Sequence, residues 1–429
     1  MSGGGRATPG AVGQLMSARI HRSALVLVIA LGAAGCADDR DPCGEVGVLC
    51  TIAGTGESGF EIPAVAGVPA VEQTLYLPVD VAADPDGKLV VVDFGNSCFR
   101  ELDRATGTMR RIIGKGDIGF GCPDGGLECD ALDFALNHAS SITFDGDDAV
   151  VAGFFNSVVL RIDRQTGAVT EVFGAGTRGE YTGDGGPAVD AAFGLPTAVA
   201  VDDDGGILVL DQENQVIRRI DPDGTIARVA GNCLIDDPYV SPCAAGQEPV
   251  ACEESEKLTC GDPARGCFEP CSAGYSGDGG PALEARFGLV TGAQVLPSRI
   301  TRGPSGSLLI ADTLNHRIRQ IDDDGRVTTV AGTGEAGAGP GQLNRPVDVA
   351  VGPDGALYIA DSWNDCVQAI RPGGELAPVA GRCGEPGYAG DGGPATDALL
   401  DQPLGVEVAD GVLYIADTAN HVVRAMRLE

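Results

Sequence analysis

The chain has 429 residues, of which 43% are hydrophobic, so it is long enough for a large core or for several domains. Its 65 glycines and 26 prolines favour many turns and short strands over long helices. The formal net charge of −32 repels DNA and RNA, so the composition argues against a nucleic-acid partner.

The first 35 residues have the pattern of a secretory signal peptide. Three residues of the positive flank, Arg19, His21 and Arg22, precede the apolar run at 23–35. That run is too short, and is followed too closely by polar residues, to remain as a membrane span. The biological start is either Met1 or Met16.

Cys36 follows Ala-Ala-Gly directly and resembles the lipid-modified cysteine of a bacterial lipobox. We therefore expect lipidation at Cys36, a tether over residues 36–46, and a protein held on a membrane of the bacterial cell envelope, facing the extracytoplasmic side. The alternative is a secreted protein in which Cys36 forms a disulfide.

One segment recurs six times without a gap in the rest of the chain. Its copies occupy residues 91–103, 151–163, 209–221, 310–322, 359–371 and 415–427. A segment similar to P-x-x-V-x-V-D precedes each copy, and V-x-x-V-A-G follows five of them. Asp-Gly and Pro-Asp-Gly turns separate these pieces, so each unit is predicted to form four short strands.

Six small sheets can bury both of their faces if they pack radially around an axis. The predicted fold is all-β, a six-bladed β-propeller of four-stranded antiparallel blades over residues 47–429. The sixth copy lacks its V-A-G segment, whereas residues 49–56 (LCTIAGTG) match residues 327–334 (VTTVAGTG) and precede the first unit. The N-terminal strand is therefore predicted to complete the last blade and close the ring.

The repeated unit resembles the NHL repeat, spelled here as Asn315-His316-Arg317 and Asn420-His421-Val422. Three connections contain G-D-G-G-P-A, at 181–196, 275–288 and 388–403, and are similar to those of bacterial NHL proteins and of the teneurin NHL propeller. The second unit departs from the pattern, with Gly153 in place of Asp and Ala139 in place of Pro.

Two columns of the repeat are nearly constant, and we interpret both as structural. Because Asn tolerates a left-handed φ and caps turns, and Asp accepts N–H bonds, we expect these side chains to hold turns. The residues are Asn96, Asn156, Asn214, Asn315, Asn364 and Asn420, with Asp93, Asp211, Asp312, Asp361 and Asp417.

The column after Asn contains His in two units only, His316 and His421. A catalytic zinc needs about three converging ligands. Amidating lyases of similar fold hold zinc in the channel, but these two histidines are expected at blade turns with one blade between them. No zinc site is predicted.

A second resemblance, to calcium-dependent lactonases with six blades, implies a metal site made of channel oxygens. Asp80, Asp348 and Glu407 alternate with apolar residues and are candidates for such a site. The simpler interpretation is an acidic, hydrated channel wall. Asp184, Asp278 and Asp391 of the G-D-G-G connections are weaker calcium candidates, and these connections lack the Lys of a phosphate-binding loop.

The 14 cysteines favour an oxidising compartment. We expect Cys366–Cys383 across one hairpin, and Cys43–Cys50 and Cys122–Cys129 as local pairs, with Cys98 left over or paired with Cys122. Six more lie in an insertion at about 232–273 and are expected to pair with one another: Cys233, Cys243, Cys252, Cys260, Cys267 and Cys271.

From these patterns we expect a monomeric binding or scaffold module for a protein or polysaccharide, without a catalytic residue or a cofactor. The alternative is a calcium-dependent, lactonase-like or other hydrolase with its site in the channel.

Overall fold

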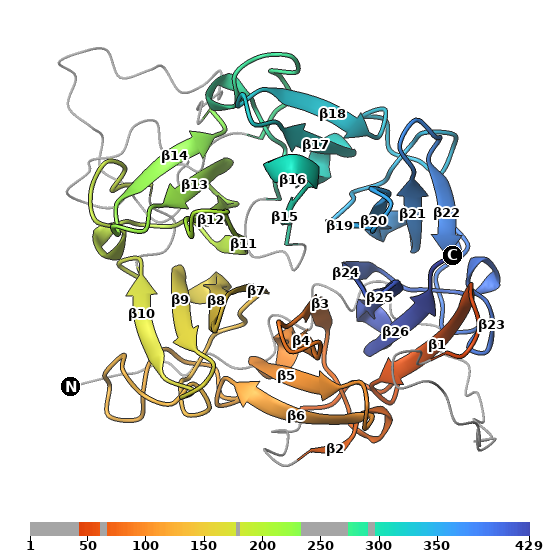
Figure 1. Ribbon diagram of the computed structural model, residues 1–429, viewed down its shortest axis with the longest axis horizontal. Helices are drawn as coiled ribbons and strands as arrows, with labels where there is room; N and C mark the ends of the chain where they lie inside the picture. The colour runs from red at the N-terminus through yellow and green to blue at the C-terminus, as the bar shows by residue number, and fades with distance from the viewer. Residues whose placement is uncertain (1–42, 61–66, 177–180, 233–272, 291–296) are drawn as a thin grey trace, which may run out of the picture.

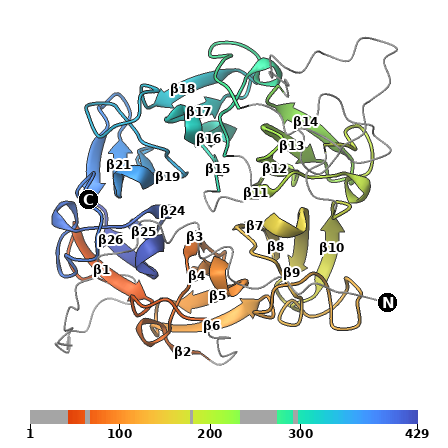
Figure 2. The ribbon, with the colours of Figure 1, turned by 180° about the vertical axis from the view of Figure 1, so that it is seen from behind.

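The computed structural model describes residues 43–60, 67–176, 181–232, 273–290 and 297–429. Six antiparallel sheets are arranged as blades around a central axis (Figures 1 and 2). In these ranges every helix is a three-residue 3₁₀ turn, and none is long and apolar enough to cross a membrane. The predicted all-β, six-bladed propeller is confirmed.

Each blade contains four strands ordered from the axis outward. Blade one has β3 (Pro78–Ala83), β4 (Leu89–Asp93), β5 (Cys98–Asp103) and β6 (Thr108–Ile113). Blade two has β7 (Ser141–Asp145), β8 (Asp148–Gly153), β9 (Val158–Asp163) and β10 (Val169–Phe173). Blade three has β11 (Pro196–Val201), β12 (Ile207–Asp211), β13 (Val216–Ile220) and β14 (Ile226–Ala230).

Blades four to six follow the same order. Blade four has β15 (Ile300–Arg302), β16 (Leu308–Asp312), β17 (Arg317–Ile321) and β18 (Val327–Ala331). Blade five has β19 (Asp348–Val351), β20 (Leu357–Asp361), β21 (Cys366–Ile370) and β22 (Ala377–Ala380). Blade six has β24 (Pro403–Ala409), β25 (Val412–Asp417), β26 (Val422–Arg427) and β1 (Val48–Ala53).

The N-terminal strand closes the ring, as the repeat count predicts. β1 pairs antiparallel with β26, placing Leu49 opposite Met426 and Thr51 opposite Arg424. Leu49 is fully buried between blades five and six. The fourth strand of the last blade therefore comes from the beginning of the repeat region (Figure 1).

Short 3₁₀ turns join the second and third strands of five blades. They are η2 (Phe94–Asn96), η3 (Phe154–Asn156), η7 (Thr313–Asn315), η8 (Ser362–Asn364) and η10 (Thr418–Asn420). Four others lie in the connections between blades, η1 (Ala70–Glu72), η4 (Ala188–Asp190), η5 (Ala282–Glu284) and η9 (Ala395–Asp397), and η6 (Pro304–Gly306) follows β15.

The G-D-G-G connections cover the outer edge of blades three, four and six. Backbone N–H groups of Gly185, Gly279 and Gly392 donate to outer-strand carbonyls over 2.7–2.8 Å. In blade six the connection continues as β23 (Gly393–Pro394), and β2 (Val68–Pro69) takes the same place in blade one. Covering these edges satisfies backbone groups that would otherwise pair with another chain.

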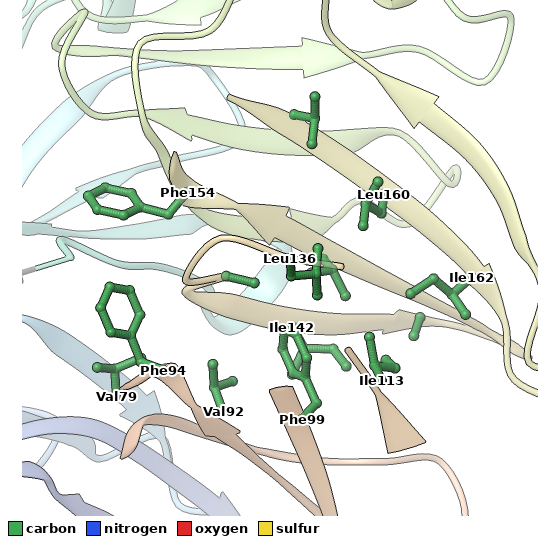
Figure 3. Packing of buried hydrophobic residues seen from close by; sticks show 14 of the residues in the cluster. Val79, Val92, Phe94, Phe99, Ile113, Leu136, Ile142, Phe154, Leu160 and Ile162 are labelled. Atoms are coloured by element: carbon green, nitrogen blue, oxygen red, sulfur yellow. The ribbon is translucent and has the colours of Figure 1, made fainter. Parts of the chain in front are cut away.

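The core consists of apolar layers between neighbouring blades. Each strand presents alternate residues to the blade before it and the blade after it. Figure 3 shows the layer between blades one and two, where Val92 and Phe99 of blade one face Leu160 and Ile162 of blade two.

Candidate functional site

The six innermost strands, β3, β7, β11, β15, β19 and β24, surround the axis (Figures 1 and 2). In the aligned repeats, one column places a residue of each blade at the same level along the axis. Each of these residues lies opposite the residue that precedes the Asp column of the second strand. The six residues are Asp80, Ser141, Ala198, Arg299, Asp348 and Gly405.

An ion pair crosses the axis at this level. Nη1 of Arg299 in blade four donates to Oδ2 of Asp80 in blade one over 2.7 Å, and Nη2 donates to the carbonyl of Val79 over 2.8 Å. Arg299 is 2% exposed and Asp80 is 7% exposed. Since blades one and four are opposite each other in the ring, the guanidinium obstructs the channel here.

Two further acids lie beside this pair. Oδ1 of Asp348 accepts the N–H of Val349 at 2.8 Å, and Oδ2 accepts the N–H of Val406 in the next blade at 2.9 Å. Burial, together with the charges of Asp80 and Asp348, raises the pKa of Glu407 to about 8. Burial also raises the pKa of Asp80 to about 7, against the opposing effect of Arg299.

The three predicted acids thus come together beside the Arg299 guanidinium. Asp80 and Asp348 already accept bonds on both oxygens, Asp80 from Arg299 and from the N–H of Val81 at 3.0 Å. Across the described ranges no group of three or more His, Cys, Asp or Glu side chains is arranged to hold a metal ion. The positive charge among these carboxylates is a guanidinium.

Arg299 is the axial residue that our sequence analysis missed. The signal was present, because aligning "LPSRIT" with "LPVDVA" places Arg299 in the column of Asp80. Chemically, the cluster of Asp80, Arg299, Asp348 and Glu407 can hold and exchange a proton near neutral pH.

The Asp and Asn columns form one hydrogen-bonded unit in each regular blade. In blade four, Oδ1 of Asp312 accepts the N–H of Gly288 at 2.6 Å, which fixes the connection that leads into the inner strand. Nδ2 of Asn315 donates to the same carboxylate at 2.8 Å and to the carbonyl of Gly274 at 2.7 Å. These contacts give both columns a structural role.

The Asn residues do not themselves adopt a left-handed φ. The left-handed residue is the next one along, and its φ lies between 50° and 57° in all six blades. The Asn ends the 3₁₀ turn instead, because its amide must reach the aspartate three residues earlier. These left-handed residues are Ser97, Ser157, Gln215, His316, Asp365 and His421.

Five of these left-handed residues link one blade to the next. His421 Nδ1 accepts the N–H of Leu77 at 3.1 Å, and His316 Nδ1 accepts the N–H of Arg345 at 3.1 Å. Ser97, Gln215 and Asp365 accept equivalent bonds. Both imidazoles act as acceptors and must be neutral, and burial lowers the pKa of His421 to about 4. The histidines are inter-blade links at the turns.

A buried arginine on the third strand engages the G-D-G-G connection in three blades. Arg319 Nη2 contacts Asp278 Oδ1 at 2.7 Å, and the Arg319 guanidinium stacks on the Tyr275 ring at 5.0 Å. Arg218 and Arg424 make the same pairings with Asp184 and Asp391. The weak calcium candidates of these connections are therefore partners of arginine.

Blade two lacks these contacts between the aspartate, the asparagine and the arginine. Gly153 replaces the aspartate, and Leu160 replaces the arginine that pairs with it elsewhere. The orphaned N–H of Asn137 is instead accepted by Oδ1 of Asn156 at 2.7 Å. Blade two thus lacks both charged groups, whereas blade five keeps Asp361 and pairs it with Gln368, whose Nε2 donates to Asp361 Oδ2 at 2.6 Å.

Three disulfides lie in the described residues, Cys43–Cys50, Cys122–Cys129 and Cys366–Cys383, and they are the local pairs proposed from spacing. Cys98 is buried and free, so the alternative Cys98–Cys122 pair is wrong. Burial raises the pKa of the Cys98 thiol to about 12. Cys36 and the six cysteines at 233–271 lie outside the described residues.

Comparison with known proteins supports the repeat assignment. The NHL repeat family matches residues 75–101 and 343–370. Teneurin-3 of Mus musculus is 27% identical over 288 residues, a match that covers 63% of this chain and 9% of teneurin-3. The chain thus spans less than a tenth of that relative's length. It is a six-bladed propeller in which two segments match the NHL repeat.

Solved structures of low sequence identity share the fold. An auxiliary nutrient binding protein from Bacteroides thetaiotaomicron has a TM-score of 0.56 at 15% identity, covering 88% of this chain and 75% of that one. A similar protein from Bacteroides ovatus has a TM-score of 0.55 at 16% identity, covering 89% and 76%. A putative phosphatase from Bacteroides thetaiotaomicron has a TM-score of 0.54 at 14% identity, covering 89% and 78%.

Arg319 Nη1 also lies 3.5 Å from Asp312 Oδ2, and both side chains are fully buried. This buried pair predicts strong coupling between substitutions at the two positions. Asp312→Gly or Arg319→Leu alone leaves a buried charge without its partner and is expected to cost about 3–5 kcal/mol. The double variant, which reproduces blade two, should cost about 1–3 kcal/mol less than the sum. Chemical unfolding of wild type, the two single variants and the double variant measures the free energy of unfolding of each. The same cycle at the exposed pair Asp354 and Arg371 serves as control, and equal coupling there would contradict the prediction.

The raised pKa of Glu407 predicts a pH-dependent stability. Its folded pKa of about 8 exceeds the unfolded value near 4.5, so the folded protein keeps a proton that the unfolded chain releases. This contribution is complete below pH 4.5 and is lost as pH rises towards 8. Glu407→Gln should therefore gain stability relative to wild type between pH 5 and 8, by about 1–3 kcal/mol. Thermal unfolding at several pH values tests this, with exposed Glu375→Gln as control; a constant difference would contradict it.

Proposed function

We propose that this NHL-repeat propeller is a lipid-anchored, extracytoplasmic binding module for a protein or glycan. We place the binding surface on the connection face, made by the segments that join the fourth strand of one blade to the first strand of the next. The observation that carries the proposal is the position of the exposed apolar side chains.

Ten of the eleven large hydrophobic side chains that are exposed in the described residues belong to these segments. They include each exposed aromatic residue, with Phe60 at 72% and Phe120 at 43% as the examples nearest blades one and two. The full set is Phe60, Val68, Val71, Ile118, Phe120, Leu127, Val189, Tyr275, Leu283 and Tyr388. Four of them, Val68, Val71, Val189 and Leu283, follow the outer strands to the turns between the third and fourth strands, and these four are not part of the connection face. Exposed aromatic groups are typical of interaction surfaces and suit both protein side chains and sugar rings.

The arrangement of the axis favours the same choice. Arg299 obstructs the channel at the level of Asp80, and its charge is already paired. Two solved structures with this fold are named as auxiliary nutrient binding proteins, which supports a binding role by fold-level analogy.

The lipid anchor rests on the sequence around Cys36, and the disulfides agree with an oxidising compartment. We expect the propeller to be monomeric and held on the extracytoplasmic side of a membrane of the cell envelope.

A hydrolase in the channel is the second candidate, and one observation favours it. The pKa values of Asp80 and Glu407, about 7 and about 8, suit a proton donor and acceptor near neutral pH. Stoichiometric calcium in the purified protein, or hydrolysis of lactones that is lost in Glu407→Gln, would favour this candidate.

Binding at the connection face is tested with the purified protein against immobilised envelope polysaccharides and envelope proteins. The variant Phe60→Ser/Ile118→Ser should weaken binding to any partner found by about tenfold or more, equal to about 1.4 kcal/mol. Arg371→Ser, an equally exposed change at the hairpin turns of the opposite face, serves as control. The proposal fails if the double variant binds normally or if the control loses affinity equally.

The anchor is tested by Cys36→Ser. Without the thiol no lipid can be attached, so the variant should move from the membrane fraction to the soluble extracytoplasmic fraction. Cys98→Ser, at a buried free cysteine, controls for the loss of a thiol. Unchanged membrane association of the Cys36 variant would refute lipidation at this residue.

A further inference from the structure

A cavity of about 370 Å³ lies between blades one and two. Its apolar floor is formed by Val90, Ile113, Ile142, Ala149 and Ile162, which come from both blades. Figure 3 shows Ile113, Ile142 and Ile162 gathered at one end of the layer between these blades. The volume lies within the range of small-molecule sites.

The cavity results from small side chains on both sides of one interface. At each interface, the residue three positions before the Asp column of one blade belongs to the same apolar cluster as the residue four positions before that column in the next blade. The pairs at the other five interfaces are Val150 with Ile207, Leu208 with Leu308, Leu309 with Leu357, Tyr358 with Leu413, and Tyr414 with Leu89. Here the pair is Val90 with Ala149, the smallest of the six.

The mouth of the cavity is charged, and its charges are already paired. Lys88 and Arg110 both donate to Glu101 Oε1, at 2.8 and 2.9 Å. Arg164 donates to Asp84 and Asp86, each at 2.8 Å. A ligand with a charged group would have to break one of these contacts, whereas a neutral hydrogen-bonding group can join them.

We propose that this interblade cavity binds a small, uncharged amphipathic molecule. Its apolar body, a ring or a short branched chain, occupies the space between Val90 and Ala149. Its hydroxyl or amide group lies among the polar groups of the mouth, where Gln165 donates to Asp147 over 2.7 Å. The cavity is distinct from both the axial cluster and the connection face.

The test uses benzyl alcohol, benzoate and benzylamine as probes, which share a ring and differ in the charge of the polar group. Ligand-observed NMR titration of the full chain should show that benzyl alcohol binds wild type most tightly. Ala149→Leu gives blade two the Leu found at this position in four other blades and fills the cavity. This variant should weaken the affinity for benzyl alcohol at least tenfold. Its unliganded melting temperature should stay the same or rise.

Ala338→Leu, the same change at an exposed site, should leave binding unchanged. Val90→Leu fills the cavity from the opposite side and replaces Ala149→Leu if that variant does not fold. The proposal is overturned if benzyl alcohol does not bind wild type or binds the filled variants equally well. Tighter binding of benzoate or benzylamine would overturn the assignment of an uncharged ligand.

Discussion

The pairing of β1 with β26 is the constraint on which the ring depends. Apart from the axial contacts of Arg299 with Val79 and Asp80, the apolar layers of each blade pack against its two neighbours. An open ring would therefore expose the apolar faces of the first and last blades. β1 also completes the side-chain network of blade six. Thr51 Oγ1 donates to Asp391 Oδ2 at 2.7 Å, as Thr329 in blade four donates to Asp278 at 2.6 Å. The closing strand thus supplies the same side chain that an uninterrupted repeat would have placed there.

The fold was predictable because the same physical requirement is repeated six times in one chain. The repeat count gave the number of blades, and the missing V-A-G segment located the closing strand. The turn conformation was predicted less well. The alignment reveals that Asn is constant, but not that its amide is needed by Asp three residues earlier while its neighbour takes the left-handed φ.

The site was harder to predict because its key residues break the repeat. Arg299 occupies an axial position where other blades have Asp, Ser, Ala or Gly, and the sequence preceding it in blade four is longer than in the other units. The buried arginines were overlooked for a different reason. An Arg in a strand usually indicates a surface position, and only the contacts show that Arg218, Arg319 and Arg424 are fully buried.

Departures from the repeat are therefore the most informative residues for function. Loss of Asp and Arg in blade two is compensated by Asn156, so that departure preserves structure. Arg299 and Glu407 have no such structural counterpart. Neither have Val90 and Ala149, which form the smallest of the six pairs compared and line the cavity between blades one and two. Selection for stability alone favours a filled interface, because added buried contacts are stabilising. An unfilled interface beneath a mouth of paired charges is thus better explained by an occupant than by packing.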